Sequence, residues 1–451
     1  TGDHIYTGDT TIAAGTLALG DGGATGSVRG NIVNRGALVL NRSDDITLPG
    51  TISGSGTVTK KGSNTLTLTG DNAYTGLTTI EGGALRVGTG GASGALAGDI
   101  AFTGAGDLIF DRSDASQYAG AISGAARLAK NGAGTLILSG DNAHTGGTLI
   151  SGGTLQLGDG GVTGSVKGDI VNNGVLAFNR SDNVTYGNLI SGTGSLIKRG
   201  SNTLTLTRAN TYSGDTLIEA GTLKTGVADA FAKASGLTIA SGARLNLGGF
   251  NQTIAQLDNR GVILFNDLGA PAKLGGLTVT GSMKHSGMLV LNTCADCAGQ
   301  VLTLSGDWVG DGGTLGFGVV LGGDDSKADR LVIGGAASGT TYVAVTNEGG
   351  SGAQTVEGIE LIRTAGSTDD AFVQQDRIVA GAYEYHLQKG SATGNNENVW
   401  YLTSLIALPE IPQVDPVPDV PDNPAPPAGD GEAAPDVGDT TKPGGDVPAT
   451  G

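Results

Sequence analysis

Two cysteines, Cys294 and Cys297, are the residues of this 451-residue chain whose type and spacing most suggest chemistry. In a reducing compartment a Cys-x-x-Cys pair indicates redox or metal chemistry, but a zinc site needs further ligands and His285 is the only histidine nearby in the sequence. In an exported chain the same spacing predicts a small-loop disulfide. We favour the disulfide over free thiols, and both over a metal or redox function.

Patterns for other chemistry are missing from the sequence. It has no Gly-x-Ser-x-Gly elbow, no His-Glu-x-x-His pair and no phosphate-binding loop that ends in Gly-Lys-Ser/Thr. The Asp-Gly-Gly stretches at 20–23 and 158–161 are read as turns rather than calcium loops, and Asp324-Asp325 as a solvated loop. The sequence therefore predicts no catalytic residue, no cofactor and no metal ion.

Two polar clusters recur along the chain. Asn41-Arg42-Ser43-Asp44 returns with small changes at 111–114 and 179–182, and this repetition favours turn chemistry with Arg–Asp pairing over a ligand contact. The second cluster is Gly-Asp-Asn-Ala-Tyr-Thr-Gly, with Tyr6, Tyr74, His144 and Tyr212 at equivalent aromatic positions that we expect to be exposed. Packing within the loop is the simplest role for these rings, and a widely spaced ladder for a glycan or protein is the alternative.

The elements that must position these clusters form a repeat. The stretch from Gly62 to Gly88 returns at 132–158 and 200–226, which gives a long repeat of about 69 residues. Within it, five-residue runs of alternating apolar side chains recur at intervals of 21, 20 and 27 residues, with Gly, Asn and Asp between them. No run has helical periodicity. We expect stacked coils of short strands, three coils per long repeat, with the third coil enlarged by a loop that protrudes at Asp71 to Gly76.

That loop is where we expect any repeated ligand contact. Its candidate residues are Asp71, Asn72, Tyr74, Asp141, Asn142, His144 and Tyr212.

Composition narrows the class of protein. The chain has 82 glycines, only 15% charged residues and a net charge of −17. Nucleic-acid binding is not indicated because lysine and arginine are not clustered. The last segment, 405–451, holds nine acidic residues, one lysine and most of the prolines, which predicts an extended, disordered linker. The chain begins within a repeat and has no signal peptide, so we expect it to be an internal fragment of a longer precursor.

Three segments resemble one family. Residues 326–339, SKADRLVIGGAASG, and the pair Gly381-Ala382-Tyr383-Glu384-Tyr385-His386-Leu387 and 398–404, NVWYLTS, resemble the end of pertactin-like autotransporter passengers. The repeat around TLTLTGDNAYTG is similar to the passenger-associated repeat of the same secretion system. The resemblance implies an exported passenger with a right-handed β-helix and an autochaperone region. The paired cysteines are a departure from the cysteine-poor passengers.

From these observations we predict an all-β protein, a right-handed parallel β-helix followed by a disordered Pro-rich tail. We place the repeats in 1–292, a pertactin-like autochaperone cap in 293–404 and the acidic linker in 405–451. Large aromatic residues concentrate in the cap and are its expected core anchors: Trp308, Phe372, Tyr383, Tyr385 and Trp400.

The predicted function is that of an autotransporter passenger. It would be an adhesin or cell-interaction rod at the bacterial cell surface or outer membrane, or secreted, after passage through the periplasm. Its C-terminal region would nucleate folding. Its partners would be a host cell surface, matrix or a second copy, and an outer-membrane β-barrel translocator would follow the fragment. The alternatives are a spacer that displays an upstream domain and a polysaccharide-acting or esterase enzyme on the same scaffold.

Overall fold

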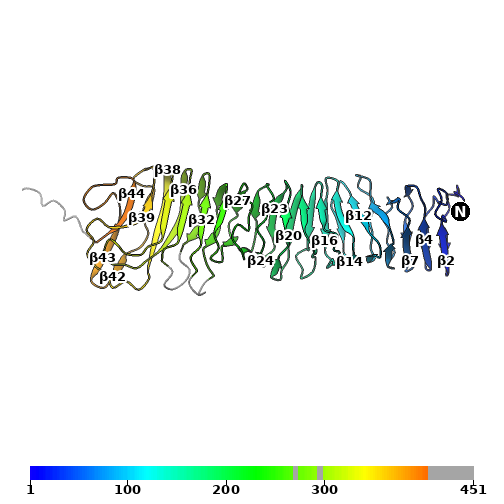
Figure 1. Ribbon diagram of the computed structural model, residues 1–451, viewed down its shortest axis with the longest axis horizontal. Coiled ribbons are helices and arrows are strands. Elements are labelled where there is room, and N and C mark those ends of the chain that lie inside the picture. Colours follow the sequence, from blue (N-terminus) through cyan, green and yellow to red (C-terminus); the bar gives the residue numbers. More distant parts are fainter. Residues whose placement is uncertain (268–272, 292–297, 405–451) are drawn as a thin grey trace, which may run out of the picture. The chain divides into compact units, whose positions relative to one another are not determined.

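The computed structural model describes residues 1–267, 273–291 and 298–404 (Figure 1). Cys294, Cys297 and the 405–451 linker lie outside these residues. The described chain forms 44 strands and no helix, and so it has no helix that is long and apolar enough to cross a membrane. The described residues up to 404 form a single rod of stacked coils, a parallel β-helix.

Each coil places one segment on each of three faces, which we name A, B and C. Face A contains β1 (Thr10–Ile12), β3 (Ile32–Asn34), β6 (Ile52–Ser53), β13 (Ser116–Tyr118), β16 (Thr135–Leu138), β18 (Thr154–Leu157), β20 (Val175–Asn179), β23 (Ser195–Arg199), β25 (Thr216–Ile218), β27 (Gly236–Ile239), β30 (Gln256–Asn259), β33 (Met283–His285) and β40 (Gly366–Ser367).

Face B contains β2 (Thr16–Leu19), β4 (Ala37–Asn41), β7 (Thr57–Lys61), β9 (Thr78–Ile80), β11 (Ile100–Phe102), β14 (Ile122–Gly124), β21 (Val184–Tyr186), β24 (Thr203–Leu206), β26 (Thr222–Thr225), β28 (Arg244–Asn246), β31 (Val262–Leu264), β34 (Met288–Val290) and β41 (Phe372–Gln374). Two long strands, β36 (Trp308–Val319) and β38 (Ala336–Asn347), turn the corner from face A to face B, since β36 pairs with β33 at one end and with β34 at the other.

Face C contains β5 (Ile46–Leu48), β8 (Thr65–Leu68), β10 (Gly83–Val87), β12 (Gly106–Asp111), β15 (Arg127–Asn131), β17 (Thr148–Ile150), β19 (Ile170–Asn172), β22 (Ile190–Ser191), β29 (Gln252–Ile254), β32 (Gly276–Val279), β35 (Val301–Leu304), β37 (Arg330–Ile333), β39 (Ile359–Arg363) and β44 (Val399–Thr403).

The apolar alternation of the sequence builds the interior. In β4 the side chains of Leu38 and Leu40 point inward and are buried, while Val39 between them faces out, as the two-residue period of a strand requires. Upstream of the C-terminal end, strands of successive coils pair in parallel, so Leu38 stacks on Leu17 and on Val58. One hydrophobic core consequently runs from Ile12 to Leu402.

The long repeat does not contain three coils, as the sequence spacing suggested. From β9 to its counterpart β17 the chain passes through eight strands, β9 to β16, and two shorter segments at Ala95 and Asp141–Thr145, which makes ten segments. Ten segments distributed over three faces make three complete coils and one additional segment. The 27-residue interval, which runs from β7 to β10, therefore starts on face B and ends on face C: β7 pairs with β9 on face B, whereas β10 pairs with β8 on face C.

The C-terminal end of the rod is closed by strands that run the other way. β39 pairs with β44 in antiparallel fashion, and β44 pairs with β43 (Tyr383–Lys389), which also pairs with β42 (Ile378–Ala380). These antiparallel strands cover the edge that a next coil would otherwise occupy, and an open strand edge is prone to unwanted pairing.

The corners need glycine where one coil lies directly on the next. A β-carbon built on Gly76 would lie 2.1 Å from the carbonyl oxygen of Gly56, a backbone atom of the preceding coil. The Gly76 position thus excludes a side chain because of contact, although its own φ is not positive.

We expect Gly76→Ala to lower the free energy of unfolding by about 1–3 kcal/mol, because backbone of two coils must move apart. The measurement is the denaturant midpoint of the full chain. Gly91→Ala is the matched control, since nothing lies within 4 Å of a β-carbon there. Equal midpoints for the two variants would contradict tight corner stacking.

Candidate functional site

The repeated Asp-Asn-Ala-Tyr loop is part of the wall of the rod and does not protrude, so the sequence prediction of a protruding corner is wrong. The N–H of Ala73 donates to the carbonyl of Ile52 at 3.0 Å, and Asp71 forms a parallel bridge with Ala95. The segment therefore pairs with the coil before it and the coil after it. The equivalent segment at Asp141 pairs in the same way with Ile122 and Ser165, but on face B.

The asparagine of this segment holds three coils together. Asn142 accepts from the N–H of Ile122 at 3.0 Å and donates at 2.9 Å to the carbonyls of Gly140 and Ser165. Asn72 and Asn210 make the same set of bonds to their own coils. All three side chains are buried. These asparagines complete the backbone pairing at an irregular position, and Asn72 and Asn142 are not available to a ligand.

The aromatic residue of the segment also points inward. Tyr74 and Tyr212 are fully buried, and their hydroxyl groups lie 2.6 Å from the hydroxyls of Thr78 and Thr216. The expectation of exposed rings is therefore wrong for Tyr74, His144 and Tyr212, and only Tyr6, in the first coil, is exposed, by 44%. A threonine four residues later supplies the partner that a buried hydroxyl requires.

His144 replaces tyrosine in this inward position. Its Nε2 lies 3.1 Å from the Thr148 hydroxyl, and its Nδ1 is buried without a partner. Burial lowers the pKa of His144 to about 4. The ring is a neutral interior residue at pH 7, which agrees with its interpretation as a repeat variant rather than a base.

The two repeated clusters meet in space. Arg42, Arg112 and Arg180 each donate through two nitrogens to the aspartate two residues later, at 2.8–2.9 Å, and the hydrogen bond from Arg42 holds the pKa of Asp44 below its usual value. Each guanidinium also lies near the aspartate of the other cluster, 3.1 Å for Asp3, 3.5 Å for Asp71 and 3.7 Å for Asp141. The exposed carboxylates Asp71 and Asp141 therefore already have a cationic partner in the rod.

Sequence reasoning missed three buried lysines. Lys60, Lys130 and Lys198 point into the core, and each ammonium donates to three backbone carbonyls at two stacked corners. Burial lowers the pKa of Lys198 to about 8. The signal was present in the sequence: each lysine stands two residues after an inward Val or Leu, at the parity of a core position.

Four aromatic rings form a continuous spine in the C-terminal coils. The ring centroids of His285 and Trp308 are 5.2 Å apart, those of Trp308 and Phe372 6.2 Å, and those of Phe372 and Trp400 5.5 Å. The rings come from β33, β36, β41 and the antiparallel strand β44, and β38, which pairs with both β36 and β41, contributes none of them. Of the expected anchors, Trp308, Phe372, Trp400 and Tyr385 are buried, whereas Tyr383 is 38% exposed and is not a core residue.

Buried polar groups fix the same end of the rod. The Tyr385 hydroxyl bonds at 2.9 Å to Gly322 and to both backbone groups of Ala353. Asp329 accepts from three backbone N–H groups at 2.7–2.8 Å; burial raises its pKa to about 6, although those donors act in the opposite direction. Asp324 also accepts from three N–H groups. Burial acts to raise its pKa, but the three donors together hold it below the usual value.

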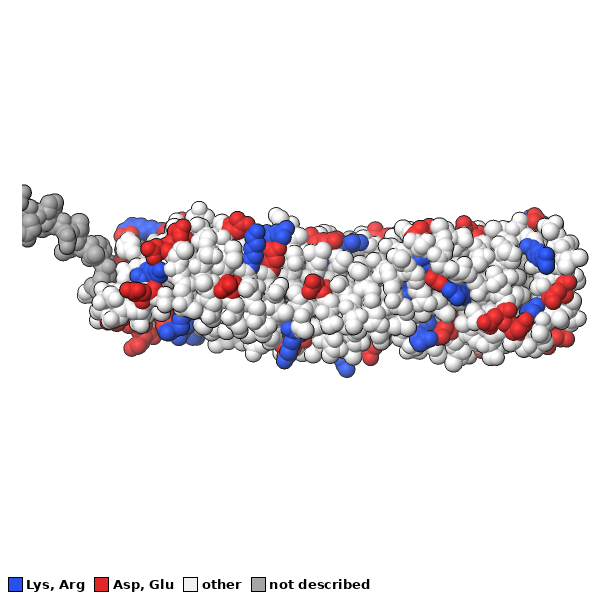
Figure 2. Space-filling model, turned by 90° about the horizontal axis from the view of Figure 1, so that it is seen from above, with Lys and Arg blue, Asp and Glu red and all other residues white. Residues whose placement is uncertain are grey.

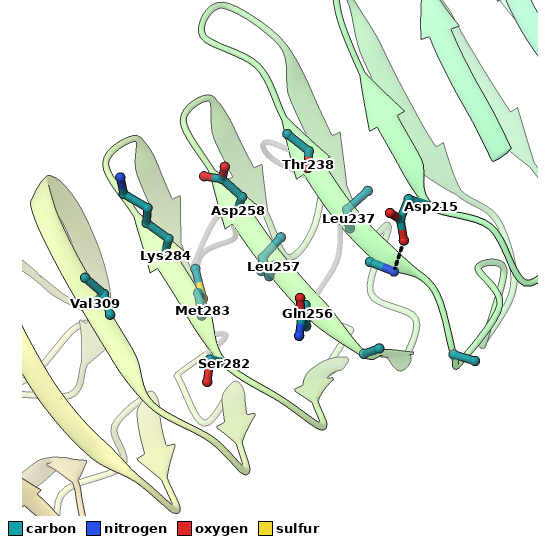
Figure 3. Close-up of a pocket in the computed structure, with 13 residues that line it drawn as sticks. Asp215, Leu237, Thr238, Gln256, Leu257, Asp258, Ser282, Met283, Lys284 and Val309 are labelled. Carbon is teal, nitrogen blue, oxygen red and sulfur yellow. Dashed lines mark hydrogen bonds between the residues drawn. The ribbon is translucent and has the colours of Figure 1, made fainter.

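A groove of about 670 Å³ lies on the outer surface of face A (Figure 3). It crosses β27, β30, β33 and the start of β36. Thr238, Asp258, Lys284 and Val309 stand in one row because they are register partners in successive coils. Gln256 and Ser282 line its other side, and Asp215 closes one end, where it accepts from the N–H of Gly236 at 2.9 Å.

Charges are dispersed over the described surface. Figure 2 shows lysines and arginines next to acidic residues, in small groups separated by wide neutral areas, on the face in view. Ion pairs such as Arg127–Asp107 and Arg199–Glu219 join neighbouring charges of the described residues. Within the described residues no group of three or more His, Cys, Asp and Glu side chains has the arrangement of a metal site.

Family models match the repeats and the C-terminal region. The passenger-associated-transport-repeat matches residues 1–19, 58–87, 128–157 and 196–224, and the autochaperone domain type 1 matches residues 278–387. The chain is an autotransporter passenger. The repeat matches follow the strands that lead into and out of the Asn72, Asn142 and Asn210 segments, and the autochaperone match contains most of the aromatic spine of the passenger.

Several relatives of known sequence are also named autotransporters. The passenger is 33% identical to the adhesin BmaC autotransporter of Brucella suis over 88% of its own length and 10% of that protein. It is 44% identical to the autotransporter adhesin AIDA-I of Escherichia coli over 25% of its length and 9% of that protein, and 37% identical to YuaQ of Escherichia coli over 53% and 16%. The passenger thus spans less than a fifth of each of these relatives.

The crystal structure of the Haemophilus influenzae Hap adhesin aligns with 88% of the passenger and 64% of that chain, at 14% identity. The TM-score of 0.34 is too low to support an argument about this chain.

The family of the passenger places it at the bacterial surface or among proteins secreted through the outer membrane.

Acid should destabilise the rod in part through His144. Its pKa rises from about 4 in the folded passenger to about 6.5 in the unfolded chain, so only the unfolded chain takes up a proton between these values. Stability is then fully present above pH 6.5 and falls as the pH drops to about 4. His144→Tyr installs the residue of the other copies and should remove up to about 3 kcal/mol of this loss.

The measurement is the denaturant midpoint of wild type and His144→Tyr at pH 7 and pH 4.5. His285, whose pKa burial also lowers to about 4, is unchanged in both proteins and leaves a common residual loss. Parallel losses in the two proteins would show that His144 is not titrating as a buried neutral ring.

The coil-bridging asparagine should matter for stability. Asn142→Ala leaves the N–H of Ile122 without an acceptor and removes one of the two donors to each of the Gly140 and Ser165 carbonyls. We therefore expect a loss of about 1–3 kcal/mol in the free energy of unfolding. Asn131→Ala is the control, because the Asn131 side chain faces outward and forms no hydrogen bond with a described residue. The measurement is the denaturant midpoint of both variants. A midpoint of Asn142→Ala as high as that of Asn131→Ala would refute the bridging role.

Proposed function

We propose that the passenger is an adhesin: a rigid rod whose outward side chains contact a host cell surface, matrix or a second copy. The observation that carries this proposal is the pairing of successive coils throughout the described residues, which presents rows of side chains at fixed positions on a stiff wall. The names of BmaC and AIDA-I, both adhesins, support it. An outer-membrane translocator is the partner that the family implies for export.

The structure supports the two alternatives, an enzyme and a spacer, less well. The described carboxylates are mostly engaged: Asp44, Asp114 and Asp182 with arginine, Asp324 and Asp329 with backbone N–H groups. An enzyme on this scaffold would use unpaired acids or an accessible nucleophile and base in contact, whereas the Thr148 hydroxyl and the His144 imidazole, which lie 3.1 Å apart, are buried in the core. A spacer that displays another domain is the remaining alternative.

We also propose that the region we placed at 293–404 nucleates folding of the rod. Its antiparallel strands, aromatic spine and buried Asp324, Asp329 and Tyr385 contacts join segments that are about 30 or more residues apart. Such contacts form a stable end on which each upstream coil can pair, since a coil contacts only its neighbours. Deletion of residues 306–404 should leave residues 1–300 slow to fold and sensitive to protease.

Adhesion is tested by binding of the purified chain to host cells, to immobilised matrix and to itself. We expect saturable binding to at least one of these surfaces. Saturable binding to none of them would favour the spacer.

Two matched substitutions test nucleation without removing the region. Phe372→Ala and Phe110→Ala both empty a buried aromatic position beside another ring, with centroid distances of 5.5 Å to Trp400 and 5.5 Å to Tyr118. Each should cost about 3–5 kcal/mol. If the C-terminal region nucleates, Phe372→Ala slows refolding, whereas Phe110→Ala mainly speeds unfolding. Equal effects on the refolding rate would contradict the proposal.

A further inference from the structure

The groove on face A has polar groups that the fold itself does not use. The Thr238 hydroxyl and the Gln256 amide form no side-chain hydrogen bond with any described residue. Ser282 accepts from the N–H of Asp307 at 3.1 Å, which leaves its own O–H free to donate. These groups come from neighbouring coils and line one groove (Figure 3), so they can meet one ligand together.

The groove is closed to a peptide that binds as an added strand. β27, β30 and β33 each pair with a strand on both sides, so their backbone N–H and C=O groups are already bonded. Strand addition requires an open edge. The apolar residues of the floor, Leu237, Leu257 and Met283, face the core and are almost fully buried. A ligand in the groove is therefore held through outward side chains.

The charges of the groove occur as pairs. Asp258 is bound by the guanidinium of Arg260, and the Lys284 ammonium lies 3.2 Å from the carboxylate of Asp311. With Asp215 at the end, acids outnumber bases by three to two around the groove. This balance disfavours a polyanion and leaves groups that suit a neutral chain of hydroxyls.

The spacing of the groups indicates an extended ligand along the rod. Successive coils repeat at about 4.8 Å, so the row from Thr238 through Asp258 and Lys284 to Val309 offers one side chain per coil over about 15 Å. Amide, hydroxyl, carboxylate and ammonium groups all bond to sugar hydroxyls. Val309, which is 41% exposed, provides apolar contact for a sugar ring at the end of the row.

We infer that this groove binds a linear neutral glycan. The inference rests on the proposed adhesin function and names its ligand class and its site, with Gln256, Thr238 and Ser282 as direct contacts and the Asp258 and Lys284 pairs as further hydrogen-bonding groups.

The test uses the full chain and immobilised hexasaccharides: chitohexaose, cellohexaose and maltohexaose as neutral probes and a heparin hexasaccharide as the polyanion. We expect saturable binding of at least one neutral probe and a five- to tenfold weaker affinity for Gln256→Ala/Thr238→Val. Thr79→Val is the matched control, since Thr79 is an outward, half-buried residue of β9 without a side-chain hydrogen bond. Its affinity should equal that of wild type.

Three results would overturn the inference: no binding of any neutral probe, tighter binding of heparin than of every neutral probe, or equal affinity of the double variant and wild type. Unaltered thermal stability of the double variant excludes misfolding as the cause of a loss. Binding of wild type and double variant to periodate-oxidised cells separates the two proposals. If cell binding survives both the oxidation and the double substitution, glycan binding in the groove is refuted and the adhesin function stands. If a probe binds but cells do not, glycan binding in the groove stands and adhesion to cells is refuted.

Discussion

Everything in this rod depends on backbone pairing between one coil and the next. A coil of about 20 residues cannot bury its own leucines, and most of the described strands, with only two to six residues, are too short to stand alone. Pairing in register stacks Leu17, Leu38 and Val58 and brings corner backbones into contact, as at Gly56 and Gly76. Wherever a segment is irregular, a side chain takes over the pairing, and the buried Asn72, Asn142 and Asn210 are the clearest instances.

The same constraint explains the different character of the C-terminal region. A stack of parallel coils has no natural end, because each coil leaves an unpaired edge. The antiparallel strands β42, β43 and β44 end it, and the Trp400 ring of β44 packs on Phe372 of β41. Asp329 fixes the segment before β35 against β36, and the Tyr385 hydroxyl binds the segments that follow β36 and β38. Side-chain contacts thus add to the stability of the C-terminal end, whereas backbone pairing between coils stabilises the rest of the rod.

Much of the fold was predictable from sequence, because two-residue alternation in runs such as GALVL identifies both strand and inward face. The misassigned parts share a cause. The sequence Asp-Asn-Ala-Tyr-Thr-Gly looks like a loop since its residues are polar, yet Asn72 and Tyr74 are buried with partners that only the pairing reveals. Likewise the 27-residue interval resembles a longer coil until β7 is seen to pair with β9. The groove was not predictable, since Thr238, Gln256 and Ser282 belong to no motif and become neighbours through register alone.

The extra face in each long repeat has a consequence for how such a rod can change over generations. Repeated copies with shared motifs invite loss or gain of one whole unit by recombination, at positions such as those in Gly62–Gly88 and its counterpart at 132–158. Each such event would shorten or lengthen the rod and also turn every downstream surface by a third of a revolution relative to the upstream coils. Only gain or loss of three units restores the original orientation of the downstream surfaces. The number of repeats therefore sets both the length of the rod and the side on which its downstream surfaces lie.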